Sequence, residues 1–161
     1  MLGDISGLEN IYIVCGYTDM RKSASLEETL GYYGEQIVLK AQELGLNTCW
    51  VAMTHGKSKA EISKDEKQVC LISLGYGASS GIPHKNKSLS DVCNYSADMP
   101  DWFLSGMEAA LLAPTAMNQQ KFFFEFMPDS TVKATCGRGF YTKLDLGIVK
   151  YHFEIGSGRK I

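Results

Sequence analysis

The sequence predicts one α+β domain in which helices flank a central antiparallel or mixed sheet. Two segments, 26–44 and 142–155, repeat apolar residues at helical spacing. Several shorter runs are rich in β-branched and aromatic residues, and a turn joins two of them. With 161 residues, 45% of them hydrophobic, the chain is long enough to bury one core.

The first half of the chain is expected to begin with a strand and a long helix. Residues 11–15 form a β-branched and aromatic run that is typical of a strand. Ser25 and Glu28 have the spacing of a capping box for a helix over 26–44, and Gly45 follows as its C-cap. The stripe that should face the core consists of Leu26, Leu30, Tyr33, Ile37, Ala41 and Leu44.

Two apolar runs follow this helix. Residues 48–52 and 68–74 are continuously apolar rather than alternating, which predicts strands in the middle of the sheet. We expect a short solvated helix over 58–64 between them. A glycine- and serine-rich loop over 75–87, ending in basic residues, follows the second run.

The next helix is expected to start at Pro100 and Asp101 and to end before Pro114. Proline suits the first turn of a helix, whereas it disfavours helical backbone at the residue that precedes it, Ala113. The predicted core face of this helix consists of Trp102, Phe103, Met107, Ala110 and Leu111.

The last third of the chain predicts a hairpin and a closing helix. In 122–126, phenylalanines alternate with the residues between them, and a turn over 128–130 leads to a second strand over 132–136. Thr142 and Asp145 have the spacing of a helix cap. The core stripe of this last helix should consist of Leu144, Ile148, Tyr151 and Ile155.

Composition excludes several classes of protein. A net charge of −2 favours neither nucleic-acid nor anionic-membrane binding, and no apolar run is long enough to span a bilayer. Five widely spaced cysteines match neither a zinc site nor a disulfide framework, so a cytoplasmic protein with reduced cysteines is expected. The three histidines have no ligand spacing, and we therefore expect no metal site.

Three segments in order resemble the nitroreductase superfamily of flavin enzymes. Residues 113–120, Ala-Pro-Thr-Ala-Met-Asn-Gln-Gln, are similar to its signature Pro-Ser-x-x-Asn-x-Gln-Pro-Trp. Residues 31–50 are similar to its long helix and the following strand, and 144–154 to the closing helix of its two-part branch. The resemblance implies a nitroreductase-like sandwich over the whole chain, 1–161, with FMN as cofactor.

The resemblance also implies contacts for the flavin ring. In the family the signature loop lies against the isoalloxazine ring, so Asn118, with Thr115 and Gln120 beside it, should contact the ring. Without the resemblance, the same residues could be an ordinary loop whose amides bond to nearby backbone. Ala52 and Met53 align with a small-residue pair at the flavin's edge, although Met53 is bulkier than that arrangement favours.

Lys85 and Lys87 correspond to a basic pair that holds the FMN phosphate in the family. Charge-assisted contacts of this kind contribute about 1.5–3 kcal/mol each. The alternative is a lysine-rich loop that lies in solvent. No residue is singled out as an acid or a base, because the flavin performs the hydride chemistry while the protein binds and orients it.

The sequence departs from the family at its start and in the signature loop. The family's first helix and the arginine segment before its first strand have no counterpart, and Lys121 and Phe122 stand where the family has Pro-Trp. The chain could be a naturally shortened gene product, a fragment, or a relative that has lost the cofactor. Because lost helical cover would expose apolar surface, a homodimer is expected.

The function expected from the resemblance is that of an FMN-dependent oxidoreductase. It would take a hydride from NADH or NADPH and reduce a nitro or quinone-like small-molecule acceptor. The alternative is a non-catalytic flavin-binding or structural dimer that has lost turnover. The sequence does not choose between NADH and NADPH, and it does not name the physiological acceptor.

Overall fold

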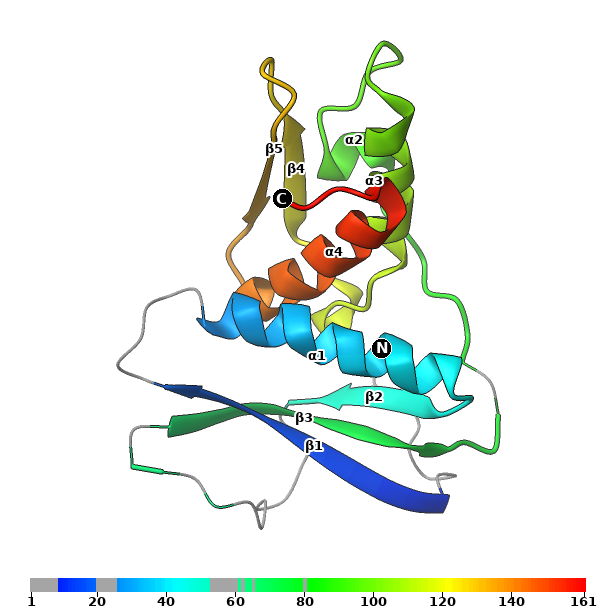
Figure 1. The fold of residues 1–161 in the computed structure, drawn as a ribbon, viewed down its shortest axis with the longest axis vertical. Helices are drawn as coiled ribbons and strands as arrows, with labels where there is room; N and C mark the ends of the chain where they lie inside the picture. The colour runs from blue at the N-terminus through cyan, green and yellow to red at the C-terminus, as the bar shows by residue number, and fades with distance from the viewer. Residues whose placement is uncertain (1–8, 20–25, 53–60, 62, 65, 80) are drawn as a thin grey trace.

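The computed structural model describes residues 9–19, 26–52, 61, 63–64, 66–79 and 81–161 (Figure 1). It confirms the α+β class. In chain order the elements are β1 (Glu9–Asp19), α1 (Leu26–Glu43), β2 (Asn47–Val51), β3 (Glu66–Tyr76), α2 (Leu89–Val92), α3 (Asp101–Leu112), the 3-10 turn η1 (Ala116–Asn118), β4 (Phe122–Phe126), β5 (Val132–Cys136) and α4 (Thr142–Ser157). The predicted order of strands and helices is therefore present, with α2 and η1 in addition.

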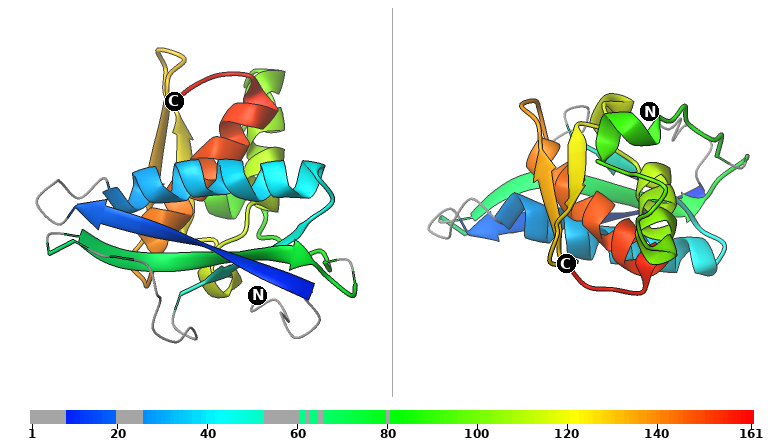
Figure 2. Two further views of the ribbon diagram at one scale, coloured as in Figure 1. Left: turned by 60° about the horizontal axis from the view of Figure 1, so that its bottom comes forward. Right: turned by 90° about the horizontal axis from the view of Figure 1, so that it is seen from above.

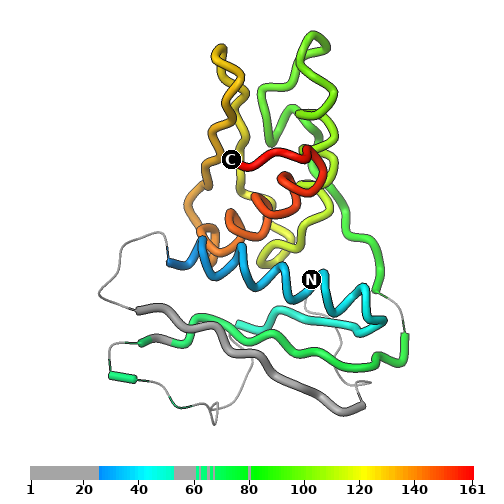
Figure 3. Tube along the Cα trace, in the orientation of Figure 1, coloured from blue at the N-terminus to red at the C-terminus, as the bar shows by residue number. Residues whose placement is uncertain are grey.

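The elements form layers that are built by different halves of the chain. A three-stranded sheet lies at one end, α1 crosses its face, and α4 crosses α1 on the other side (Figures 1 and 2). The tube in Figure 3 shows that the chain builds the sheet and α1 first, and then α2, α3, the β4–β5 hairpin and α4. The signature loop, which contains η1, therefore belongs to the second half of the chain.

The sheet has the order β1-β3-β2, and both of its pairs are antiparallel. Its middle strand is β3, as predicted, and Ile72 pairs with both Val14 and Trp50. The prediction that β2 is also central is wrong, because β2 lies at the edge of the described sheet. An apolar run does not by itself distinguish an edge strand that a helix covers from a central strand. Only Val51 of β2 is buried and the rest of the strand is half-buried, whereas residues 69–73 of β3 are buried.

The core face predicted for α1 is only partly correct. Tyr33, Ile37 and Leu44 are exposed, whereas Glu35 and Val38 are buried. The helix packs on the sheet with one side and on α4 with another, so two of its faces are buried. A search for one apolar stripe does not predict the buried residues of a helix when two of its faces are covered.

Glycines allow α1 and α4 to cross with their backbones in contact. A Cβ atom added to Gly147 would lie 1.8 Å from the carbonyl oxygen of Glu28, and one added to Gly31 would lie 2.0 Å from that of Leu144. Both distances are far below a van der Waals contact. Neither position therefore accepts a side chain unless the helices move apart.

The main core lies between α3, α4 and the β4–β5 hairpin. The rings of Phe124 and Phe153 stack at 4.9 Å, and both side chains are fully buried together with Phe103. The predicted alternation in β4 is confirmed, since Phe122 and Phe124 are buried and Phe123 is partly exposed. On α3, the predicted residues Phe103, Met107, Ala110 and Leu111 are buried, whereas Trp102 is half-buried at the edge of the core.

The stripe predicted for α4 holds only in its first half. Leu144 and Ile148 are buried, whereas Tyr151 is half-buried and Ile155 is exposed. Like α1, this helix is covered on more than one side, by α1, α3 and the hairpin. Phe153, which lies outside the predicted stripe, is fully buried in the main core.

Some local predictions differ from the structure or fall outside it. Thr142 and Asp145 do not cap α4, because its N-cap residue is Tyr141 in the left-handed conformation and Asp145 bonds elsewhere. Strand β3 continues to Tyr76, so the loop predicted over 75–87 is shorter. Ser25, Met53 and residues 58–60 and 62 of the helix predicted over 58–64 lie outside the described residues.

Candidate functional site

The signature loop leaves α3 at the predicted place and then takes an unusual backbone path. Ala113, before Pro114, is extended and ends the helix. Beyond it, Met117, Asn118 and Gln120 have φ angles of 52°, 51° and 44°. Left-handed backbone in residues other than glycine costs on the order of 1 kcal/mol each or more, so contacts with the rest of the molecule must hold this loop.

Gln120 is the centre of those contacts and is only 2% exposed. Its backbone N–H donates to Thr115 Oγ1 at 3.1 Å. Its side-chain Nε2 donates to the carbonyl oxygen of Lys85 at 2.8 Å and to Asn118 Oδ1 at 2.7 Å, while its Oε1 accepts from the backbone N–H of Lys87 at 2.9 Å. The carboxamide of Gln120 thus joins the signature loop to the basic loop.

Two further hydrogen bonds join the same loops. Lys87 Nζ donates to the carbonyl oxygen of Gln120 at 2.9 Å, and Asn118 Nδ2 donates to that of Lys85 at 2.9 Å. The structure therefore brings together residues that lie about thirty positions apart in the sequence. We call this set the amide cluster: Thr115, Asn118, Gln120, Lys85 and Lys87.

Some N–H groups at the surface of the amide cluster are not used by the hydrogen bonds within it. Both Nε2 hydrogens of Gln120 are used inside it, and Thr115 is buried. Asn118 is half-buried, and its Nδ2 carries a second hydrogen beyond the one that bonds Lys85. The ammonium of Lys87 likewise has hydrogens beyond the one that bonds Gln120. The surface of the cluster can therefore donate to an acceptor-rich ligand.

Asp145 supports the signature loop from α4, a contact that sequence reasoning missed. Its carboxylate is 4% exposed; Oδ1 accepts from the backbone N–H of Ala116 at 2.9 Å and Oδ2 from Gln119 Nε2 at 2.7 Å. Gln119 Nε2 also donates to the carbonyl oxygen of Phe140 at 2.8 Å. Burial raises the pKa of Asp145 to about 6, although the hydrogen bonds from Ala116 and Gln119 oppose that shift.

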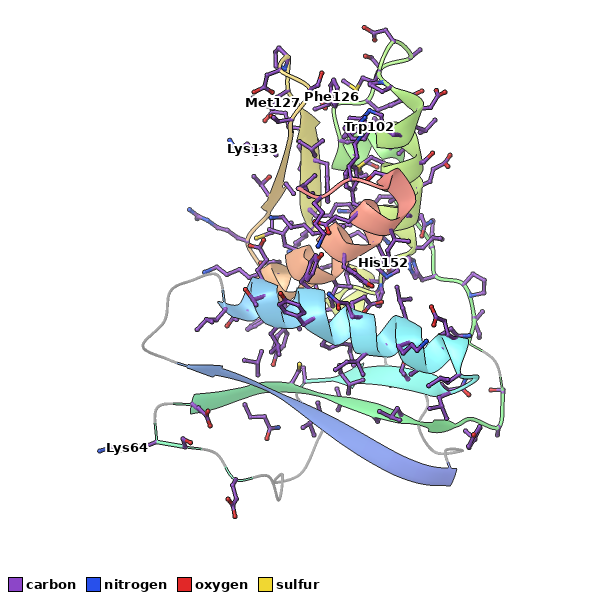
Figure 4. All side chains as sticks on the ribbon, viewed as in Figure 1. Lys64, Trp102, Phe126, Met127, Lys133 and His152 are labelled. Carbon is purple, nitrogen blue, oxygen red and sulfur yellow. The ribbon has the colours of Figure 1, made fainter. Side chains whose placement is uncertain are left out.

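Ala52, at the flavin edge in the resemblance, is half-buried immediately after β2. A buried carboxylate holds the end of this strand. Glu35, only 1% exposed, accepts from Trp50 Nε1 at 3.1 Å and hydrogen bonds His152 Nε2 at 2.8 Å (Figure 4 labels His152 on α4). Glu35 thus links α1, α4 and β2 within one chain.

Among the described residues, no three His, Cys, Asp or Glu side chains are grouped so that they could hold a metal ion. Within those residues, too, no helix combines the length and the apolar character needed to cross a membrane. Cys93 is buried, and this burial raises the pKa of its thiol.

Two open hollows lie beside Tyr32, where α1 meets α4. One of about 250 Å³ is lined by residues that include Tyr33 and Lys150, and one of about 370 Å³ by residues that include Tyr151 and Glu154. None of the predicted site residues lines either hollow. The amide cluster is therefore a separate surface.

Comparison with known proteins assigns the family. A family model described as "Putative TM nitroreductase" matches residues 9–157, which is most of the chain. The chain belongs to this nitroreductase family. The match confirms the resemblance inferred from the three sequence segments. Among curated proteins, none matches the chain.

A solved structure supports the fold of this nitroreductase-family chain. The crystal structure of a putative nitroreductase from Thermotoga maritima is similar to it, with a TM-score of 0.70 and 21% sequence identity. The similarity covers 92% of this chain and 66% of that one. The chain thus spans about two thirds of the length of its structural neighbour, and at this identity the likeness concerns the fold.

Proposed function

We propose that this chain is an FMN-dependent oxidoreductase of the nitroreductase type, which oxidises NADH or NADPH and reduces nitro or quinone-like acceptors. The observation that carries the proposal is the amide cluster. Its two parts are the segments for which the family resemblance implies ring and phosphate contacts, and hydrogen bonds hold them together. Family membership provides the oxidoreductase class.

The donor set of the amide cluster fits FMN chemically. The pyrimidine side of a flavin offers carbonyl oxygens and ring nitrogens, and the ribityl chain ends in a phosphate. In our proposal the remaining amide hydrogen of Asn118 contacts the ring, and the ammonium groups of Lys85 and Lys87 contact the phosphate. Thr115 and Gln120 hold these donors in place, because their own polar groups are bonded within the cluster.

The chain's other residues would shape and support the site. Ala52 and Met53 are the proposed neighbours of the flavin's edge, and Glu35 fixes the strand that leads to them through Trp50. When bound, FMN would supply the hydride chemistry itself. The protein's part is to orient the ring and to neutralise the phosphate.

A homodimer is part of the proposal. The two hollows beside Tyr32 lie away from the amide cluster, and in our proposal a second copy of the chain helps to cover the flavin. Tyr33, Ile37 and Leu44 leave an exposed apolar row on α1, and such surface favours association. Sedimentation of the purified protein should give the mass of two chains.

Reconstitution with FMN tests the proposed cofactor. Added FMN should bind with quenching of its fluorescence and a shifted band near ~450 nm, which is characteristic of oxidised flavin. Lys87→Ala should weaken binding about tenfold, because one charge-assisted contact is lost. The matched control is Lys133→Ala on exposed β5, which should bind FMN like the wild type. Wild-type protein that takes up no FMN would refute the proposal.

One observation favours a second candidate, a non-catalytic flavin-binding or structural dimer. Gln120, one of the proposed signature residues, uses both of its amide hydrogens inside the chain. A loop that serves only to join two segments would have the same bonds. Oxidation of NADH by the FMN-loaded protein, at a rate well above that of free FMN, would exclude this candidate.

A further inference from the structure

Asp145 is a buried carboxylate that does not cap its own helix and is not one of the proposed flavin contacts. Its two oxygens accept from Ala116 N–H at 2.9 Å and from Gln119 Nε2 at 2.7 Å. Both donors belong to the signature loop, and the carboxylate comes from α4. Placing a carboxylate at 4% exposure is unfavourable unless its hydrogen bonds offset the lost hydration.

The helix that carries Asp145 and the loop that it bonds differ in how firmly they are held. Asp145 lies in the first turns of α4, two residues before Gly147, whose backbone touches Glu28 of α1. That crossing leaves α4 little room to move. The loop, in contrast, contains Met117, Asn118 and Gln120 in left-handed backbone, which few residues adopt without support. The rigid helix therefore sets the position of the strained loop.

We infer that Asp145 is the positioning residue for flavin binding: its carboxylate holds η1 in the conformation that presents Asn118 to the ring. The inference rests on the proposed function. Gln119 Nε2 donates both to this carboxylate and to the carbonyl oxygen of Phe140, which lies just before α4. The signature loop is therefore bonded both to α4 and to the residues that precede it. Asn118 follows Ala116 by two residues, and its backbone N–H donates to the carbonyl oxygen of Thr115 at 2.9 Å, so both residues belong to the same turn.

Asparagine cannot replace Asp145 in this arrangement. An amide offers one oxygen and one NH2 group, whereas both donors that face Asp145 need an acceptor. In Asp145→Asn, the NH2 group would face either Ala116 N–H or Gln119 Nε2. The loop would then occupy its binding conformation for a smaller fraction of the time, and the apparent dissociation constant for FMN rises in inverse proportion to that fraction.

The test is FMN affinity, measured by flavin fluorescence. Asp145→Asn should bind FMN at least about tenfold more weakly than the wild type, the effect of losing one charge-assisted hydrogen bond. Asp101→Asn is the matched control, because it removes a carboxylate from the first turn of α3, and it should bind within about twofold of the wild type. Gln119→Ala removes one of the two bonds while leaving Asp145 in place, and it should weaken binding even if Asp145→Asn does not fold.

A double-mutant cycle separates positioning from a general loss of structure. If Asp145 acts through Asn118, then Asp145→Asn should weaken binding much less in an Asn118→Ala background than in the wild type. Hydrogen exchange of the backbone over 113–121 should also be faster in cofactor-free Asp145→Asn than in the cofactor-free wild type. Two results would overturn this inference and leave the proposed function standing. One is additive effects in the cycle. The other is that folded Asp145→Asn and Gln119→Ala bind FMN as tightly as the wild type. A wild type that binds no FMN would overturn the proposed function as well.

Discussion

The contact between α1 and α4 makes a direct prediction about Gly147. In Gly147→Ala, the new methyl group would lie 1.8 Å from the carbonyl oxygen of Glu28 and 2.7 Å from the backbone nitrogen of Tyr32. Both neighbours are backbone atoms of a helix, so no side chain can turn aside. A carbon and an oxygen that are not bonded need about 3.4 Å, so the two helices must separate by roughly 1.5 Å or tilt.

The expected loss of stability follows from what that separation disturbs. Overpacking costs about 1–3 kcal/mol, and alanine recovers up to about 1 kcal/mol through its higher helix propensity. Because α4 also carries Phe153 in the main core, we take the upper end of this range and expect Gly147→Ala to cost about 2 kcal/mol net. For a domain of this length, that corresponds to a melting temperature lower by about 4–8 °C.

Urea unfolding followed by circular dichroism measures this effect. The midpoint for Gly147→Ala should fall while the slope stays constant, since the change acts on the folded state. Gly81→Ala is the matched control, because a Cβ there meets no atom within 4 Å. Gly31→Ala should resemble Gly147→Ala, and the two together should cost less than their sum, because one separation relieves both contacts. A midpoint for Gly147→Ala equal to that of Gly81→Ala would refute the close crossing.

Three further predictions concern buried side chains. The native pKa of Asp145 is about 6 and its ordinary value is 3.8, so the folded state binds more protons than the unfolded state between these values. The free energy of unfolding should therefore fall by about 2 kcal/mol as pH rises from 4 to 6, and Asp145→Asn should remove that fall. Glu35→Ala leaves Trp50 and His152 without their shared acceptor and should destabilise the fold by about 3 kcal/mol, with a change in tryptophan fluorescence on the folded protein. Phe124→Ala opens a cavity in the main core and should cost about 3–5 kcal/mol in denaturant unfolding, whereas a loss below about 1 kcal/mol would contradict its full burial.

Local patterns predicted much of the candidate site. Pro114 marks the end of α3, and the residues after it form the polar loop that was expected there. The sequence did not indicate that Gln120 is buried, because an amide in a loop is usually exposed, nor that Asp145 turns away from its own helix. Asp145 has the spacing of a cap, and only the position of η1 decides that its carboxylate bonds Ala116 instead.

Local patterns predicted α1, α3, α4, the strands, the alternation along β4 and the family, because these depend on residues that are near one another in the chain; α2 and η1 were not predicted. Tertiary structure alone decided the edge position of β2, the exposed row on α1, and the meeting of Lys87 with Gln120. The physical reason is that propensity and periodicity describe one segment and at most one covered face. Which segments meet, and which polar groups then find partners, depends on packing between residues far apart in the chain, such as the contact that Gly31 and Gly147 allow.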